Sequence, residues 1–287
     1  MLHLLNKDTM EDSKIILGKC EDIIPTLDDN SIDLVITSPP YNVDLGNNKF
    51  NKNPYDLYND NKDYFEYINW LKDIFQKLYI KMKKSGRIAL NVGDPHNGKI
   101  LSHVDISHFM VRELNYLSMA NIVWEKSQIS NRLSWGSWCS ASSPSFPKSF
   151  EYIMIFAKET LKLEEKGETD LLPEEFKKWA ISMWKIAPDT KMKELKHPAT
   201  FPLALPYRLI KMLSWKNATV LDPFNGAGTT GVACKKLGRK YIGIEISQDY
   251  IDISLKRINK ADEQNCDIFE GEYKIKINKN EPDNIFE

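Results

Sequence analysis

The sequence has few cysteines and almost no net charge, and both absences narrow its possible functions. The four cysteines lie far apart and form no Cys-x-x-Cys pair, so neither a zinc site nor a disulfide framework is predicted. We therefore expect no bound metal. Lys and Arg total 39 against 40 Asp and Glu, so any binding of nucleic acid requires a local basic face rather than overall positive charge.

Long hydrophobic runs are also absent. No stretch reaches the ~18 consecutive apolar residues that a membrane-spanning helix requires. The first apolar residues are soon followed by Lys7, Asp8 and Glu11, which is not typical of a signal peptide. We expect a cytoplasmic protein with no membrane partner. Its 287 residues, 42% hydrophobic and 28% charged, suit one large globular domain, and we expect a single domain over residues 1–287.

Short β-branched runs alternate with amphipathic segments along most of the chain. We expect strands at 14–18, 32–37, 87–92, 121–124, 152–156, 218–221 and 240–245. Apolar residues at spacings of three and four predict helices at 63–84, 109–117, 205–215, 229–237 and 251–258. This alternation is typical of an α/β fold with a doubly wound, mostly parallel sheet.

A first motif follows the strand expected at 32–37. It reads Ser38-Pro39-Pro40-Tyr41 and lies at the carboxyl end of that strand, where open α/β sheets bind ligands. The Ser38 hydroxyl and the Pro39 carbonyl can each accept a hydrogen bond from a planar amino group, and the prolines hold these acceptors rigidly. The ring of Tyr41 offers a face on which a base can stack. The alternative is a simple turn after a strand.

A second motif follows the strand expected at 218–221. It begins with Asp-Pro-Phe at 222–224, and its glycines Gly226 and Gly228 open a helix and leave room for a ligand close to the backbone. Glu245 ends the next strand, a position from which a carboxylate binds ribose hydroxyls; the alternative is that it only caps the following helix. With Gly231 the glycines also satisfy a dehydrogenase fingerprint, but a Ser-Pro-Pro-Tyr motif has no role in hydride transfer.

Together the two motifs resemble those of DNA amino-methyltransferases, which transfer methyl from S-adenosylmethionine to N4 of cytosine or N6 of adenine. The catalytic motif precedes the cofactor glycines, as in the β class of that family. The resemblance covers roughly residues 14–260. It implies a Rossmann-like methyltransferase fold with inserted DNA-recognition loops, an S-adenosyl-L-methionine cofactor, and double-stranded DNA whose target base is flipped out. It is compatible with a component of a restriction-modification system, paired with a cognate restriction endonuclease, or with a solitary or phage-borne enzyme, and with a monomer or homodimer.

The same resemblance assigns roles to further residues. Asp222 and Phe224 would line the methionine and adenine portions of the cofactor site, and Thr200 would contact the carboxylate end of the cofactor. Cys20 falls in a segment that approaches the adenine, although this chain has Lys19 where the family usually has Asp.

Two irregular stretches are candidates for target recognition. Residues 125–150 contain Arg132, Trp135 and Trp138, and residues 159–196 are rich in lysine towards their end. The alternatives are a loop with core-anchoring tryptophans and a solvated charged face.

Several competing activities fit the sequence less well. Methylation at C5 of cytosine uses a cysteine that follows a proline, and no cysteine here does so. Enzymes that methylate RNA or glutamine side chains usually carry Asn at the position of Ser38 and place the cofactor glycines first. A catalytically silent DNA-binding protein is a further alternative. Within the family, Ser at this position is associated more with N4 of cytosine and Asp with N6 of adenine, so we favour cytosine, with adenine as the alternative.

Overall fold

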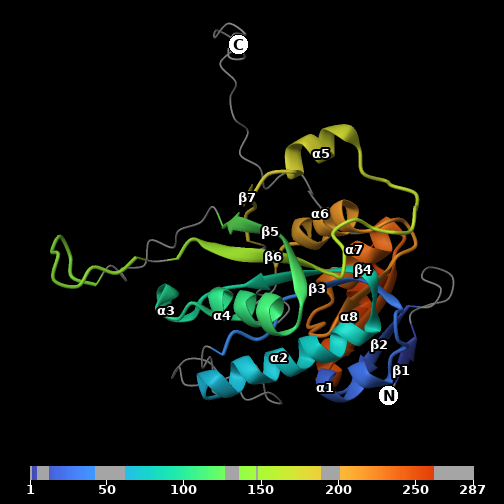
Figure 1. Ribbon diagram of the computed structural model, residues 1–287, viewed down its shortest axis with the longest axis horizontal. Helices are drawn as coiled ribbons and strands as arrows, with labels where there is room; N and C mark the ends of the chain where they lie inside the picture. Colours follow the sequence, from blue (N-terminus) through green and yellow to red (C-terminus); the bar gives the residue numbers. More distant parts are fainter. Residues whose placement is uncertain are drawn as a thin grey trace, which may run out of the picture.

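The computed structural model describes residues 2–4, 13–42, 62–126, 136–146, 148–188 and 201–261. Within these ranges, nine strands form one mixed sheet in the order β1-β2-β9-β8-β3-β4-β6-β5-β7 (Figure 1). The strands are β1 Leu2–Leu4, β2 Lys14–Leu17, β3 Ile32–Thr37, β4 Met82–Val92, β5 Tyr116–Glu125, β6 Phe150–Lys158, β7 Met183–Lys185, β8 Thr219–Asp222 and β9 Lys240–Glu245.

The central part of the sheet is parallel. Strands β2, β9, β8, β3 and β4 run in the same direction, whereas β6 is antiparallel to both β4 and β5. At the two edges, β7 is parallel to β5 and β1 is antiparallel to β2. The predicted α/β fold with a mostly parallel sheet is therefore confirmed.

Helices cover both faces of the sheet (Figure 1). They are α1 Cys20–Ile23, the 3-10 turn η1 Ile24–Thr26, α2 Tyr64–Lys81, α3 Pro95–Gly98, α4 Ser102–His108, the π-helical turn η3 Phe109–Glu113, α5 Pro173–Trp179, α6 Ala204–Leu213, α7 Thr229–Leu237 and α8 Gln248–Asn259. One hydrophobic cluster joins the sheet to α2, α4 and η3, and another joins it to α5, α6, α7 and α8. A sheet covered in this way is doubly wound.

Helix α2 ends earlier than its sequence pattern predicted. Asp63 begins it as the N-cap, accepting hydrogen bonds from the N–H groups of Phe65 and Glu66. The helix ends at Lys81, and β4 starts at Met82. Between Ile32 and Leu34 of β3 the register against β4 shifts. The Ser-Gly pair at 85–86, which follows the helix expected at 63–84, therefore lies in an irregular part of a strand, and Ser85 there has a positive φ of 65°.

The helix expected at 109–117 lies earlier in the chain. Helical structure covers α4 and η3 and ends before Asn115, whose φ of 60° is left-handed. Asn tolerates this conformation better than most residues and commonly follows a helix. Strand β5 then begins at Tyr116. The apolar residues that suggested a later helix divide between the buried end of that helical segment and the strand.

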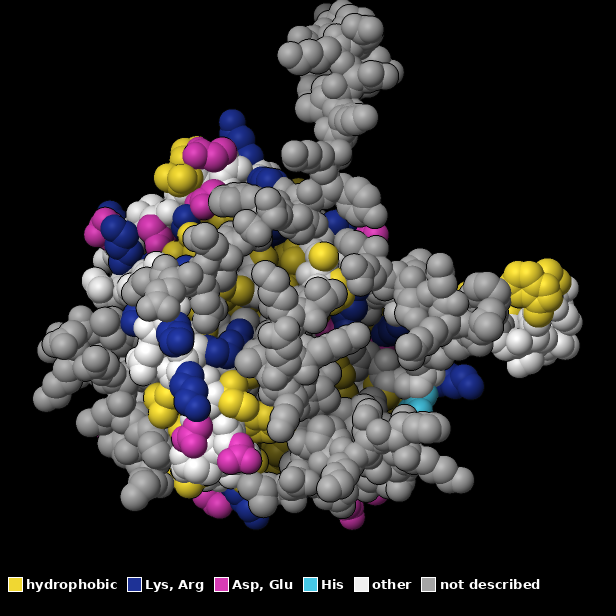
Figure 2. Space-filling model, turned by 180° about the vertical axis from the view of Figure 1, so that it is seen from behind, with side chains coloured by type: hydrophobic (Ala, Val, Ile, Leu, Met, Phe, Trp, Pro, Cys, Tyr) yellow, Lys and Arg dark blue, Asp and Glu magenta, His cyan; other side chains and the backbone are white. Residues whose placement is uncertain are grey.

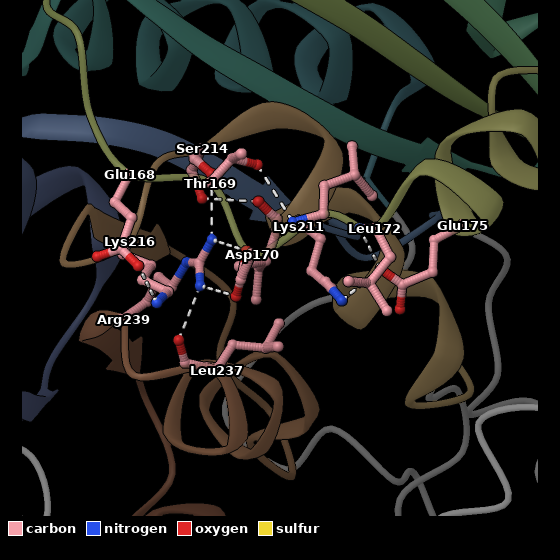
Figure 3. A network of polar contacts seen from close by, with 12 residues as sticks. Glu168, Thr169, Asp170, Leu172, Glu175, Lys211, Ser214, Lys216, Leu237 and Arg239 are labelled. Atoms are coloured by element: carbon pink, nitrogen blue, oxygen red, sulfur yellow. Dashed lines mark hydrogen bonds and ion pairs between the residues drawn. The ribbon is translucent and has the colours of Figure 1, made fainter.

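The described part of the stretch 159–196, residues 159–188, is bound to the sheet. It contains α5 and β7, and a chain of ion pairs ties it to α6 and to the start of β9 (Figure 3). Asp170 binds the guanidinium of Arg239 through both carboxylate oxygens, with Arg239 Nη2 2.8 Å from Asp170 Oδ1. Lys211 of α6 pairs with Glu175 of α5. The irregular structure predicted for this stretch is thus wrong for α5 and β7.

Candidate active site

The sheet brings the two sequence motifs together. Strands β3 and β8 are parallel neighbours, with Leu34 opposite Val220 and Val35 opposite Leu221. Their carboxyl ends therefore lie side by side at one edge of the sheet, where ligands of such folds bind. The hydroxyl of Thr37 donates a hydrogen bond of 2.7 Å to Asp222 Oδ1, which links the two motifs directly.

Asp222 holds the glycine turn in place. Besides Thr37, its carboxylate accepts hydrogen bonds from the Thr230 hydroxyl at 2.8 Å and from the Phe224 N–H at 3.1 Å. The side chain is buried, and burial raises its pKa to about 6 although these three donors oppose the rise. Asp222 thus fixes the turn relative to β3, and its predicted contact with the cofactor stays a prediction.

The glycine turn bends back toward Glu245 at the end of β9. Gly226 and Gly228 both have left-handed φ angles, 49° and 76°. The Gly226 N–H donates to Glu245 Oε2 at 2.7 Å, and the Ser247 N–H donates to Glu245 Oε1 at 3.0 Å. Burial raises the pKa of Glu245. This carboxylate therefore supports the turn and holds the residue that precedes α8, and its predicted binding of ribose hydroxyls stays a prediction.

Gly228 has a packing role beside its place in the turn. A Cβ on this residue would lie 2.5 Å from the Cβ of Ser254 in α8. Substitution at this position would disturb the contact between α7 and α8 as well as the approach of a ligand.

The residues after β2 also lie at the carboxyl end of β9, beside Glu245. The Gly18 N–H donates to the main-chain oxygen of Glu245 at 2.9 Å, because β2 and β9 are paired in parallel. Cys20 follows two residues later, but its thiol is buried in the hydrophobic core and burial raises its pKa. Thr200 lies outside the described residues. The cofactor roles of Cys20 and Thr200 stay predictions.

An aromatic pair lies beside the glycine turn. The ring of Phe224 packs against Trp70 of α2 with 5.6 Å between ring centroids, and the Lys62 ammonium lies 4.8 Å from the Trp70 centroid. Trp70 was not singled out from sequence, because it reads as one more apolar residue of an amphipathic helix.

The Ser-Pro-Pro-Tyr motif forms a hydrogen-bond network with residues from three other parts of the chain. Ser38 Oγ and Tyr41 Oη are 2.9 Å apart. Tyr41 Oη donates to Glu151 Oε2 at 3.1 Å, and Asn91 Nδ2 lies 2.8 Å from each of these two oxygens. Lys126 forms an ion pair with the other oxygen of Glu151. We call these five side chains the serine–tyrosine network.

The backbone around Tyr41 is shaped for this network. A Cβ on Gly93 would lie 3.1 Å from Tyr41 Cε2 and 3.3 Å from Glu151 Oε1, so glycine allows both groups to approach. Burial, and then the charge of Glu151, raises the pKa of Tyr41 well above its usual value, which keeps the phenol protonated.

A second polar cluster lies at the end of β4. Asp94 accepts hydrogen bonds from Lys148 Nζ at 2.6 Å and from the His103 N–H at 3.1 Å, and His103 Nδ1 lies 2.8 Å from its carboxylate. The His103 ring stacks on Tyr152 with centroids 4.0 Å apart. Burial tends to raise the pKa of Asp94, but the bonds from Lys148 and His103 outweigh it and hold the pKa below its usual value.

Comparison with known proteins identifies the family. Residues 32–256 match the N6/N4 methyltransferase family, described as DNA methylase. The chain belongs to this family. The type II methyltransferase M.MjaVI of Methanocaldococcus jannaschii is 36% identical over 171 residues, covering 59% of this chain and 83% of that protein. The type II methyltransferase M.BglII of Bacillus subtilis is 28% identical over 267 residues, covering 88% and 71%.

Solved structures share the fold of this methyltransferase. The PvuII DNA methyltransferase, which is cytosine-N4-specific, superimposes with a TM-score of 0.66 at 20% identity, covering 92% of this chain and 95% of that one. A complex of M1.HpyAVI with S-adenosylmethionine gives a TM-score of 0.56 at 22% identity, covering 85% and 98%.

Family membership gives the methyltransferase its cofactor and substrate class. It uses S-adenosyl-L-methionine and acts on DNA. The left-handed glycine turn, the Glu245 carboxylate beside it and the half-buried Phe224 ring fit a nucleoside cofactor, and they are the residues that would hold it.

Within the described ranges, no three His, Cys, Asp or Glu side chains gather into a possible metal site, and no helix has the length and apolarity needed to cross a bilayer.

Sequence reasoning missed Asn91, Lys126 and Glu151. Asn91 had a usable signal, since a polar residue inside the apolar run 88–92 is unusual in a buried strand. Glu151 and Lys126 carried none, because only the antiparallel pairing of β6 with β4 and β5 brings them beside the catalytic motif.

Proposed function

We propose that the protein is a site-specific DNA methyltransferase that methylates N4 of cytosine in double-stranded DNA. The observation that supports this most is the position of the Ser38 hydroxyl at the end of β3, beside the cofactor turn and within the serine–tyrosine network. It offers a neutral acceptor where an exocyclic amino group must be held. Adenine N6 is the alternative target, since neither base is excluded by a hydroxyl acceptor.

The roles of the residues follow from the weak nucleophilicity of an aromatic amino group. Ser38 Oγ and the Pro39 carbonyl accept hydrogen bonds from the two N–H groups and favour a localised lone pair on nitrogen. Tyr41 supports the flipped base through its ring. S-adenosylmethionine supplies an electrophilic sulfonium methyl. The amino nitrogen forms a bond to the methyl carbon as the carbon–sulfur bond breaks, and the methylated nitrogen then loses one proton to solvent.

The cofactor site is proposed at the neighbouring turn. Gly226 and Gly228 leave the backbone open to a ligand, and Glu245 would bind ribose hydroxyls with the lone pairs that remain on its carboxylate. Asp222, Phe224, Cys20 and Thr200 complete the proposed set.

The chain is proposed to act as one methyltransferase domain over residues 1–287 with two recognition segments. Residues 136–146 of the segment 125–150 extend away from the sheet (Figure 1), and hydrophobic side chains are exposed at the end of this extension (Figure 2). Trp138 is 69% exposed and Phe146 is 79% exposed. These aromatic rings suit contact with DNA bases.

The segment 159–196 differs. Its described part is fixed by ion pairs to Lys211 of α6 and to Arg239, which precedes β9, so we propose that its DNA contacts lie in the lysine-rich residues towards its end. Type II methyltransferases among the relatives support a place in a restriction-modification system with a cognate endonuclease, as a monomer or a homodimer.

The test is the identity of the methylated base. Duplex DNA is incubated with the protein and S-adenosylmethionine, digested, and analysed by mass spectrometry of nucleosides. N4-methylcytosine is expected, and modified-base sequencing of DNA from expressing cells gives the recognition sequence. N6-methyladenine as the sole product would overturn the cytosine assignment.

A further inference from the structure

The hydroxyl of Tyr41 has more partners than protons. Ser38 Oγ, Asn91 Nδ2 and Glu151 Oε2 all lie within 3.1 Å of Tyr41 Oη. A phenol has one proton to donate and two lone pairs with which to accept. The chemistry of the three partners therefore decides which of them receives the proton.

Two of the partners have fixed roles. The amide nitrogen of Asn91 only donates, and it uses its two protons on Tyr41 Oη and on Glu151 Oε2, each at 2.8 Å. The carboxylate of Glu151 is paired with Lys126 and only accepts. Tyr41 must therefore donate to Glu151.

The remaining bond takes its direction from this choice. Because the proton of Tyr41 points to Glu151, the contact of 2.9 Å between Ser38 Oγ and Tyr41 Oη requires Ser38 as the donor. The proton of Ser38 then points away from the place where a substrate amino group would lie. What Ser38 offers there is lone pairs.

The orientation of the Asn91 amide supports this order. Its Oδ1 atom is buried and has no hydrogen-bond partner among the described residues, whereas Nδ2 has two. Exchanging the two atoms would place an amide oxygen against the carboxylate of Glu151, oxygen against oxygen. The raised pKa of Tyr41 keeps its proton in place for the bond to Glu151.

We propose that Glu151 is a positioning residue that directs the hydrogen bonds from Ser38 through Tyr41 to its own carboxylate, so that Ser38 can only accept from the target amino group. This inference rests on the proposed role of Ser38 as acceptor for that amino group. Lys126 contributes through its ion pair with the other carboxylate oxygen of Glu151, and Asn91 by filling the second acceptor site of Tyr41.

The first test is Glu151→Gln in the full-length enzyme. The Gln amide has one oxygen, which can accept from Tyr41 or from Lys126 but not from both. The direction of the hydrogen bonds from Ser38 through Tyr41 is then no longer fixed. We expect kcat to fall at least ~10-fold at saturating substrates, while Kd for S-adenosylmethionine and for DNA changes less than ~2-fold, as for loss of an interaction made in the transition state. Glu168→Gln, in an exposed ion pair away from the site, is the matched control and should leave kcat unchanged.

A double-mutant cycle distinguishes loss of the hydrogen-bond direction from a general structural effect of the substitution. Tyr41→Phe removes the hydroxyl that links Ser38 to Glu151. Adding Glu151→Gln to this variant should therefore lower kcat by a further factor of less than ~3. Multiplying effects, or a Glu151→Gln enzyme with normal kcat, would overturn the proposal. Neither result would touch the identity of the methylated base, which is measured separately on the unmutated enzyme.

Neutron diffraction of the deuterated, unmutated protein tests the same point without any substitution, in case Glu151→Gln does not fold. We expect the Tyr41 deuteron on the line to Glu151 and the Ser38 deuteron on the line to Tyr41. A Tyr41 deuteron directed at Ser38 would contradict the proposal.

Discussion

The carboxylates of Glu151 and Asp170 are both shielded from solvent and each is paired with a cation, yet the two networks end differently. Arg239 donates to Asp170 and to the main-chain oxygens of Leu237 and Ser214, so all its bonds terminate inside the protein (Figure 3). The network of Glu151 continues through Tyr41 to the hydroxyl of Ser38, which is half-buried.

This difference separates stability from activity. A closed network such as that of Asp170 fixes a segment of chain against the sheet, and its loss leaves a buried guanidinium without its partner. A network that ends in a reactive-site hydroxyl instead determines which atoms that hydroxyl presents. Substitutions in the two networks should therefore change different measured quantities.

Ser38→Ala should have the largest effect, and it removes the open end of the serine–tyrosine network. The lost acceptor acts chiefly in the transition state, so kcat should fall ~100- to 1000-fold. Kd for S-adenosylmethionine should change little, and the free energy of unfolding should fall by less than ~1 kcal/mol, because the side chain is small and half-buried. Single-turnover kinetics, calorimetric titration and denaturant unfolding measure the three quantities. Equal losses in kcat and cofactor affinity would make Ser38 a structural residue.

Asp170→Asn should have the opposite profile. Removing the charge beside the fully buried Arg239 should lower the free energy of unfolding by ~3 kcal/mol, because a buried charge loses its partner. The kcat of the molecules that remain folded should be unchanged. Urea unfolding and activity per folded molecule test this. A fall in kcat without a loss of stability would place the segment around Asp170 in the catalytic machinery.

The sequence predicts the central strands and helices of this fold better than the short elements α5 and β7. Strands 32–37 and 240–245 and helix 229–237 match the structure at both ends, because β-branched runs and a glycine turn mark their limits. Helix α5 and strand β7 are short, and they are held by the ion pairs of Lys211 and Arg239 and by the pairing of β7 with β5. Contacts between residues far apart in the chain leave no pattern in the local sequence, so these two elements could not be predicted from it.

The active site divides in the same way. The two motifs could be found because each carries its chemistry in consecutive residues, and parallel pairing of β3 and β8 places them together. Glu151 is 110 residues from Tyr41, and its role depends on the antiparallel arrangement of β6, which a largely parallel prediction does not contain.

Asp222 gives the methyltransferase a pH-dependent stability opposite to that expected of Asp170. The pKa of Asp222 is raised by burial from 3.8 to about 6, so between these values the folded state binds more protons than the unfolded state. Stability should therefore fall as pH rises through this window, by on the order of 2–3 kcal/mol, and level off above it.

The pKa of Asp170 moves the other way. Burial tends to raise it, but the hydrogen bonds and charge of Arg239 outweigh burial and lower it. Its contribution to stability is present above its usual pKa of 3.8 and is lost as pH falls below that value. Denaturant unfolding of the cofactor-free protein from pH 2 to 8 tests both signs, with the Asp170 contribution lost below pH 3.8 and the Asp222 contribution lost between pH 4 and 6. Asp222→Asn should abolish the slope between pH 4 and 6, and a slope that persists in this variant would assign it to another group.

Glu168→Gln should have the smallest effect and shows whether burial is what distinguishes the Asp170 network. Glu168 pairs with Lys216 in the same segment, but its side chain is 71% exposed. Water already screens this pair, so its loss should lower the free energy of unfolding by less than ~1 kcal/mol, less still at high salt, and leave kcat unchanged. Urea unfolding at two salt concentrations measures it beside Asp170→Asn. A loss of stability as large as that of Asp170→Asn would mean that exposed and buried ion pairs hold the segment equally, so that burial of the Arg239 guanidinium does not make its pair more stabilising.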